Sequence, residues 1–286
     1  MSRAFFDLAP ESGHAAEPLL PTPVAASGWG PDHMRGMAVC GAMARAAEQA
    51  IHALGRHDLR PARWNVDLFR AARMRPCATS TSIVQTSSRL CLVDVTLTQA
   101  GEAVARATAL FLRPSETPTG SVWSGGACPQ PPERDRVSSG DPERLFYSEE
   151  VGWTVSAAPH HNGRRKQTWH FPVPVVRGEY LSPFQLAATV ADVMNVVANL
   201  GSSGLEFINP DVALTLARLP QGTELGLAAT DRVELDGISV GTAVVFDRAG
   251  VLGAATVTGL ADPRRAVDLR AFAERGAGHL YQQESP

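Results

Sequence analysis

The chain has 286 residues, of which 44% are hydrophobic, so it can bury a substantial core without disulfides or structural metals. It carries 26 basic and 29 acidic residues, which leave a formal net charge of −3. This balance produces no net field that attracts nucleic acid or an anionic membrane surface, so nucleic-acid binding is excluded as a main role.

Other features of the chain favour a cytoplasmic protein. The first thirty residues lack the basic start and apolar run of a signal peptide. Four cysteines stand far apart without a CxxC pair, which is typical of reduced thiols. Between Tyr180 and Glu206 the only charge is Asp192, but Pro183 and a break at 201–204 leave too little apolar length for a bilayer. We expect no membrane partner.

The first predicted elements are a helix and four strands. The helix is expected over 36–54, where small and apolar residues dominate and Gly55 follows as a stop. Its four polar residues are spaced as a charged outer face: Arg45, Glu48, Gln49 and His52. Strands are expected over 64–69, 80–87, 90–99 and 103–112, with a tight turn at 99–102.

A segment rich in proline and glycine separates this series from a second one. Residues 114–142 contain six prolines and show no periodicity, as in a linker. A helix over 183–200 follows, and then strands over 212–217, 224–233, 238–246 and 251–260. The predicted boundaries are an N-terminal domain over 1–113, a linker over 114–144, a C-terminal domain over 145–263 and a tail over 264–286.

The two series are spaced as an internal repeat. Arg70 and Arg218, which follow corresponding strands, stand 148 residues apart, and the turn glycines Gly101 and Gly250 stand 149 apart. This agreement favours duplication of one helix-plus-antiparallel-sheet unit over two unrelated α+β domains with coincident spacing. We expect the two units to be related by a pseudo-twofold axis and their sheets to join into one, because an uncovered sheet edge invites pairing.

The second helix carries one narrow polar stripe on an otherwise apolar surface. Its start is marked by Ser182-Pro183-Phe184-Gln185, a capping serine followed by a proline. Five polar residues then recur at steps of three or four: Gln185, Thr189, Asp192, Asn195 and Asn199. The stripe is the wall of a polar cleft or a solvated face, and both alternatives stay open.

Asp192 is the one ionisable residue on that stripe. In a cleft it can take a proton from water and direct the water at a carbonyl carbon, as a general base does. The alternative is a buried carboxylate satisfied by Asn195 or Thr189.

A duplicated helix-and-sheet unit with these local sequences resembles the double-hotdog acyl-CoA thioesterase II family. The supporting motifs are Ser182-Pro183-Phe184-Gln185, Ala191-Asp192-Val193-Met194-Asn195, Phe207-Ile208-Asn209-Pro210-Asp211 and Leu216-Ala217-Arg218-Leu219-Pro220. The resemblance implies an α+β double hotdog, two antiparallel sheets each wrapped around a central helix. It also implies hydrolysis of fatty-acyl-CoA in fatty acid metabolism, without a cofactor.

The resemblance also implies a catalytic trio. The family's helix aspartate corresponds to Asp192, its Thr or Ser before the next strand to Asn209, and its late-sheet Gln to Thr258. The last two differ from the family pattern, which motivates an alternative function: a non-catalytic protein that binds acyl-CoA or an acyl carrier. A homodimer is an open alternative to a monomer.

Several residues are candidates for binding the substrate. The helix N-terminus near Gly36 can hold a thioester oxyanion with His33 beside it, and Asn195 lies on the polar stripe. The basic segment Arg164-Arg165-Lys166 either meets the phosphates of coenzyme A or is simply solvated. No metal site is expected, because the paired histidines at 160–161 lack other ligands at suitable spacing. The GxSxG match at 237–241 stands before a predicted strand, where a serine nucleophile does not occur.

Overall fold

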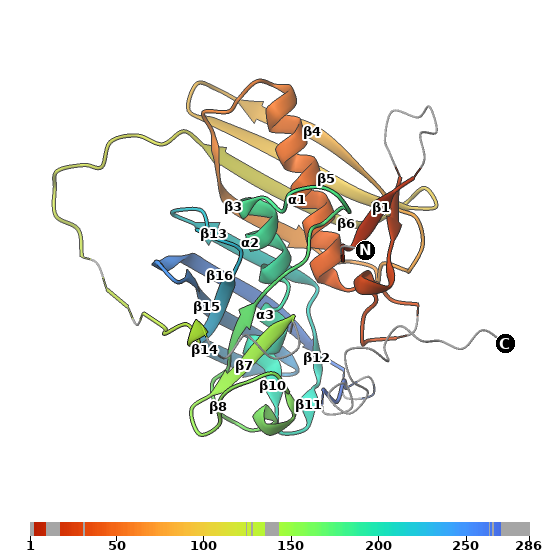
Figure 1. Cartoon of the computed structure of the whole chain (residues 1–286), viewed down its shortest axis with the longest axis vertical. Coiled ribbons are helices and arrows are strands. Elements are labelled where there is room, and N and C mark those ends of the chain that lie inside the picture. The colour runs from red at the N-terminus through yellow and green to blue at the C-terminus, as the bar shows by residue number, and fades with distance from the viewer. Residues whose placement is uncertain are drawn as a thin grey trace.

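A computed structural model of the chain describes residues 3–9, 18–30, 32–123, 125–126, 128–134, 143–262, 264 and 266–269. Most of the expected tail and part of the expected linker lie outside these residues. Figure 1 shows a helix lying against a sheet in each half of the molecule, and a long excursion of the chain between the two halves.

The first half builds a four-stranded antiparallel sheet around α1 (Gly36–Ala53). Its strands are β3 (Arg60–Asp67), β4 (Ala78–Thr86), β5 (Leu90–Gln99) and β6 (Glu102–Leu112). Alternate residues of β5 are buried, as expected for a strand with one face on a helix. The β5–β6 turn needs left-handed backbone at Ala100 and Gly101, with φ of 50° and 81°.

The second half repeats the order of elements around two short helices. These are α2 (Pro183–Ala191) and α3 (Met194–Asn199), followed by β13 (Asp211–Leu216), β14 (Leu225–Leu235), β15 (Ile238–Asp247) and β16 (Gly250–Ala261). The predicted single helix over 183–200 is therefore wrong at its centre. There the N–H of Val193 donates to the carbonyl of Val190, three residues back, so the α-helical pattern is interrupted at Asp192.

All the main strands belong to one twelve-stranded sheet, which confirms the predicted continuous sheet. Its order is β4-β5-β6-β3-β13-β16-β15-β14-β9-β7-β8, and β12 pairs with β16. The added strands are β7 (Arg144–Ser148), β8 (Gly152–Thr154), β9 (Gln167–His170) and β12 (Phe207–Ile208). The smaller elements are β1 (Phe6–Leu8), β2 (Leu19–Pro21), η1 (Pro23–Ala25), η3 (Ala158–His160), β10 (Leu200–Gly201) and β11 (Gly204–Leu205).

The strand order places the pseudo-twofold axis at the junction of the two halves. Outward from the junction, β3, β6, β5 and β4 mirror β13, β16, β15 and β14. In the antiparallel pairing of β3 with β13, Asn65 lies opposite Ala213. These two residues are 148 positions apart, the repeat offset seen in the sequence, so the axis passes through this pair. The α+β double-hotdog architecture expected from the sequence is confirmed.

The two central helices pack against each other and run antiparallel. Near the end of α1, Glu48 accepts hydrogen bonds from Ser182 Oγ at 2.7 Å and Gln185 Nε2 at 2.8 Å. Arg45 is buried and pairs with Glu179 at 2.6 Å. The predicted outer face of the first helix is therefore wrong for Arg45 and Glu48, because the second half covers that side of α1.

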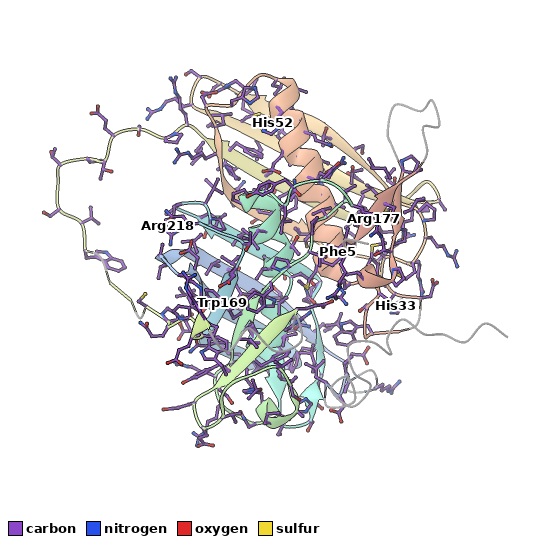
Figure 2. All side chains as sticks on the ribbon, in the orientation of Figure 1. Phe5, His33, His52, Trp169, Arg177 and Arg218 are labelled. Atoms are coloured by element: carbon purple, nitrogen blue, oxygen red, sulfur yellow. The ribbon has the colours of Figure 1, made fainter. Side chains whose placement is uncertain are left out.

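Only the remaining part of that face is open to solvent. Gln49 is exposed, and so is His52, which is labelled in Figure 2 near the end of α1. Within the described part of the chain, no helix has the length and apolar composition of a membrane span.

Candidate active site

Asp192 lies against the first turn of α1. It occupies the interruption between α2 and α3, and its carboxylate accepts a hydrogen bond from the backbone N–H of Met37. A Cβ atom at position 36 would overlap Oδ1 of Asp192, so only glycine allows this approach. The carboxylate of Asp192 thus lies at the helix start where the sequence predicts that a thioester oxyanion binds, and oxyanion binding near Gly36 stays a prediction.

The surroundings of Asp192 bring its proton affinity close to neutrality. Burial raises the pKa of its carboxyl to about 6 from the ordinary 3.8. A hydrogen bond from Asn209, the charges of Arg144 and Arg35 and the Met37 N–H act in the opposite direction and limit the rise. A carboxylate with a pKa near the working pH is suited to accept a proton from water.

A cluster of charges from distant parts of the chain surrounds this helix start. Glu143 accepts hydrogen bonds from Arg35 at 2.9 Å and from Arg3 at 2.5 Å. Burial raises the pKa of Glu143, but Arg35 and Arg144 outweigh burial and hold the pKa below its usual value. Arg144 also places Nη2 3.5 Å from Sδ of Met37. No periodic pattern in the sequence marks these residues, since Glu143 and Arg144 simply follow the proline-rich segment.

Two of the three predicted catalytic residues lie together. Asn209 places Nδ2 3.5 Å from Oδ1 of Asp192 and 3.4 Å from the backbone carbonyl of Asp211. The first distance is at the long end for a hydrogen bond, so the carboxylate retains capacity to accept from water. Thr258 instead donates to the carboxylate of Asp211, from its backbone N–H at 2.8 Å and its hydroxyl at 3.2 Å.

Asp211 therefore connects the second and third members of the predicted trio. Its backbone contacts Asn209 and its side chain holds Thr258. Asp211 is the last residue of the motif that contains Asn209, but the sequence did not predict a role for it. A signal was present, because an acidic residue at the start of a strand stands two positions after the candidate Asn209.

The polar stripe beyond Asp192 is internal to the fold. Asn195 is buried, donates to the carbonyl of Phe207 at 2.8 Å and accepts from Asn199 Nδ2 at 2.9 Å. Asn199 in turn accepts hydrogen bonds from Ser239 and Arg232, each at 3.0 Å. β15 and β16 pack against α3, and these amides satisfy one another. Substrate binding by Asn195 stays a prediction.

His33 lies just before the start of α1 (Figure 2). Its ring packs over Gly30, and its backbone pairs with Arg73. None of the hydrogen bonds found among the described residues joins the His33 side chain to Asp192. Substrate binding by His33 stays a prediction.

The basic segment 164–166 is divided between the surface and the interior. Lys166 is buried, and its ammonium group donates to the carbonyl of Asn162 at 2.9 Å, to Oδ1 of Asn162 at 3.0 Å and to the carbonyl of Arg164. Burial lowers the pKa of Lys166 to about 8. Lys166 is thus no part of an exposed basic patch. Arg164 and Arg165 are both exposed, and Arg164 is paired with Glu150.

The architecture and the pair of central helices define a double-hotdog protein. Family models for the N-terminal and C-terminal domains of acyl-CoA thioesterases match residues 25–112 and 126–260, which together make up more than half of the chain. The chain belongs to the acyl-CoA thioesterase family. No curated protein matches the sequence.

Solved structures support the fold at low sequence identity. A tesB protein of Mycobacterium avium subspecies paratuberculosis is 16% identical with a TM-score of 0.60, over 90% of this chain and 96% of that one. Acyl-CoA thioesterase II TesB2 of Mycobacterium marinum is 13% identical with a TM-score of 0.57, over 89% and 95%. A hotdog-fold protein from Alicyclobacillus acidocaldarius is 15% identical with a TM-score of 0.59, also over 89% and 95%. At these identities the likeness concerns the fold alone.

Proposed function

We propose that this protein hydrolyses a fatty-acyl thioester of coenzyme A to the free acid and coenzyme A. The observation that carries the proposal is the carboxylate of Asp192, which has a pKa of about 6 and lies at the N-terminus of α1 beside Asn209. The N-terminal end of a helix stabilises negative charge, both on the carboxylate and on an oxyanion formed next to it.

In the proposed reaction Asp192 takes a proton from a bound water while the water oxygen attacks the thioester carbonyl carbon. The carbonyl electrons move to oxygen and give a tetrahedral intermediate. Collapse of the intermediate re-forms the carbonyl and breaks the C–S bond, so coenzyme A leaves as a thiolate that takes up the proton. Asn209 orients the carboxylate, and Thr258 acts indirectly by holding Asp211.

The alternative proposal is a protein that binds acyl-CoA or an acyl carrier without hydrolysing it. It is favoured by one observation, namely that Thr258 is committed to Asp211 and does not contact Asp192 through any hydrogen bond found in the described part of the chain. The domain boundaries, a cytoplasmic location, a role in fatty acid metabolism and the homodimer are further proposals that accompany either function.

The test is incubation with acyl-CoAs of graded chain length and a thiol-reactive dye that reports released coenzyme A. Turnover that is lost in Asp192→Asn supports the proposed thioesterase activity. Tight binding of acyl-CoA by calorimetry, with no release of thiol from any chain length, supports the binding protein instead. Absence of both turnover and binding contradicts both proposals.

A further inference from the structure

A pocket of about 690 Å³ opens in the first half, between the loop that follows β3 and the β5–β6 turn. Its volume lies within the range of small-molecule sites. The wall consists of arginines, small residues and one glutamine: Arg70, Ala71, Arg73, Arg75, Pro76, Gln99, Ala100 and Val104. No sequence motif marks this loop, in which Arg70 is a landmark of the internal repeat.

Three arginines give the pocket a positive charge that its neighbours only partly neutralise. Arg70 contacts Glu102 at 3.3 Å, and both side chains are more than half exposed. Arg73 and Arg75 share a single acid, Asp32, at 4.0 Å and 3.7 Å. Such exposed, loosely paired ions exchange partners at little cost, so the guanidinium groups are available to a stronger anion.

The loop that carries the arginines is held in place from below. Gln99 is buried, its Oε1 accepts from the N–H of Arg73 at 2.8 Å, and its Nε2 donates to the carbonyls of Arg73 at 2.8 Å and Arg75 at 2.9 Å. One amide thus fixes the backbone of both arginines, while their side chains keep only the long contacts with Asp32. A site whose backbone is already ordered loses less entropy when it binds a ligand.

The pocket lies close to the candidate active site. The N–H of Met34 donates to the carbonyl of Ala72 at 2.8 Å, and the N–H of Met74 donates to the carbonyl of Asp32 at 3.0 Å, so the arginine loop is paired with the segment that leads into α1. Gly36, which contacts Asp192, follows Met34 by two residues, at most about 7 Å along the chain. Adding the strand spacing of about 5 Å puts the loop backbone within roughly 12 Å of Gly36.

We propose that this pocket binds the phosphates of coenzyme A and so selects coenzyme A thioesters; the proposal rests on the proposed function. Guanidinium groups bind phosphate oxygens through two parallel hydrogen bonds, and coenzyme A carries three phosphate groups at its nucleotide end. The pantetheine arm that joins these phosphates to the thioester is a long, flexible chain, so it can span the distance from the pocket to Asp192. A hollow of this size suits a nucleotide better than the convex surface of a carrier protein.

The test compares the double variant Arg73→Gln/Arg75→Gln with wild type on two substrates. One is an acyl-CoA, and the other is the same acyl group on pantetheine, which has no phosphates. We expect the KM for acyl-CoA to rise about 10- to 100-fold relative to the KM for acyl-pantetheine, since each lost charge-assisted contact corresponds to roughly tenfold. Arg89→Gln, an exposed arginine in the β4–β5 turn of the same domain, is the matched control and should leave both KM values unchanged.

The proposal is overturned by an unchanged KM for acyl-CoA or by an equal rise for both substrates. It is also overturned by a rise for acyl-CoA in Arg165→Gln but not in the double variant. A rise confined to an acyl-carrier-protein substrate also overturns it and assigns the pocket to a carrier.

Binding of free coenzyme A and of adenosine 3′,5′-bisphosphate, followed by calorimetry without turnover, separates this proposal from the proposed function. If no thioester is hydrolysed but the double variant loses coenzyme A binding, the proposed hydrolysis is refuted and the proposed coenzyme A pocket is supported. If wild type and double variant bind coenzyme A equally, the pocket fails whatever the turnover. Circular dichroism of the double variant checks that its fold is retained.

Discussion

Replacement of Asp192 by asparagine should remove turnover and stabilise the fold at neutral pH. The folded protein raises the carboxyl pKa from 3.8 to about 6, so the folded state favours the protonated form. Ionisation of Asp192 therefore destabilises the folded state. This destabilisation grows as pH rises from about 4 to 6 and is constant above pH 6. At about 1.4 kcal/mol per pKa unit, the destabilisation reaches ~3 kcal/mol, an upper value because Asp192 is partly open to solvent.

Asparagine keeps the shape and removes the charge. Its side-chain oxygen still accepts from the N–H of Met37, but the amide takes up no proton at neutral pH. Turnover should fall by about 10²–10⁴, the usual contribution of a positioned general base. Unfolding by urea at pH 7.5 should show Asp192→Asn to be more stable than wild type, and the two proteins should converge near pH 4.

Hydrolysis measured with a thiol-reactive dye, together with urea unfolding at both pH values, checks both parts of this prediction. Asp231→Asn, an exposed carboxylate on β14, is the control and should change neither quantity. Equal turnover in wild type and Asp192→Asn would falsify Asp192 as the base. A variant less stable than wild type at pH 7.5 would show that the carboxylate serves the structure.

Three further predictions concern the same site. The value of kcat/KM should rise with pH through about 6 and then level off, because Asp192 must be ionised; a profile with the same limb in Asp192→Asn contradicts this. Gly36→Ala should displace the carboxylate of Asp192 and lower turnover by on the order of 10². The control is Gly41→Ala, whose Cβ would lie 2.8 Å from the hydroxyl of Thr189; it should lower Tm and keep turnover. Thr258→Val removes a donor to Asp211 and should cost about 1 kcal/mol of stability in denaturant titrations; an unchanged midpoint argues against this hydrogen bond.

The fold was largely predictable because its signals are local and repeated. Alternating burial along β5 and the glycine turns at 101 and 250 mark strands and their connections, and two equal spacings identify the duplication. The joining of the sheets followed from the need to cover edges. The break at Asp192 was not predictable from helical periodicity, because the carboxylate meets the start of another helix 156 residues earlier in the chain.

The candidate site was only partly predictable. Asp192 is conspicuous as the single charge in an apolar segment, and Asn209 follows from the motif. Arg35, Glu143 and Arg144 come together only in three dimensions, so neither spacing nor composition indicates them. Arg45 and Glu48 have the spacing of a solvated face, yet Glu48 meets α2 and Arg45 meets Glu179 just before α2, and no local pattern reveals where these partners lie.

The axis through Asn65 and Ala213 has a consequence for stoichiometry. Applying the offset of 148 to the contact between Gly36 and Asp192 gives the reciprocal pair Phe184 and Ala44, in which neither the glycine nor the carboxylate is present. Phe184 is buried there, with its ring edge-on to that of Trp64 at 5.5 Å. The second copy of the site has thus become core. Each chain should therefore bind one acyl-CoA, and a titration should saturate at a single equivalent without cooperativity inside the chain.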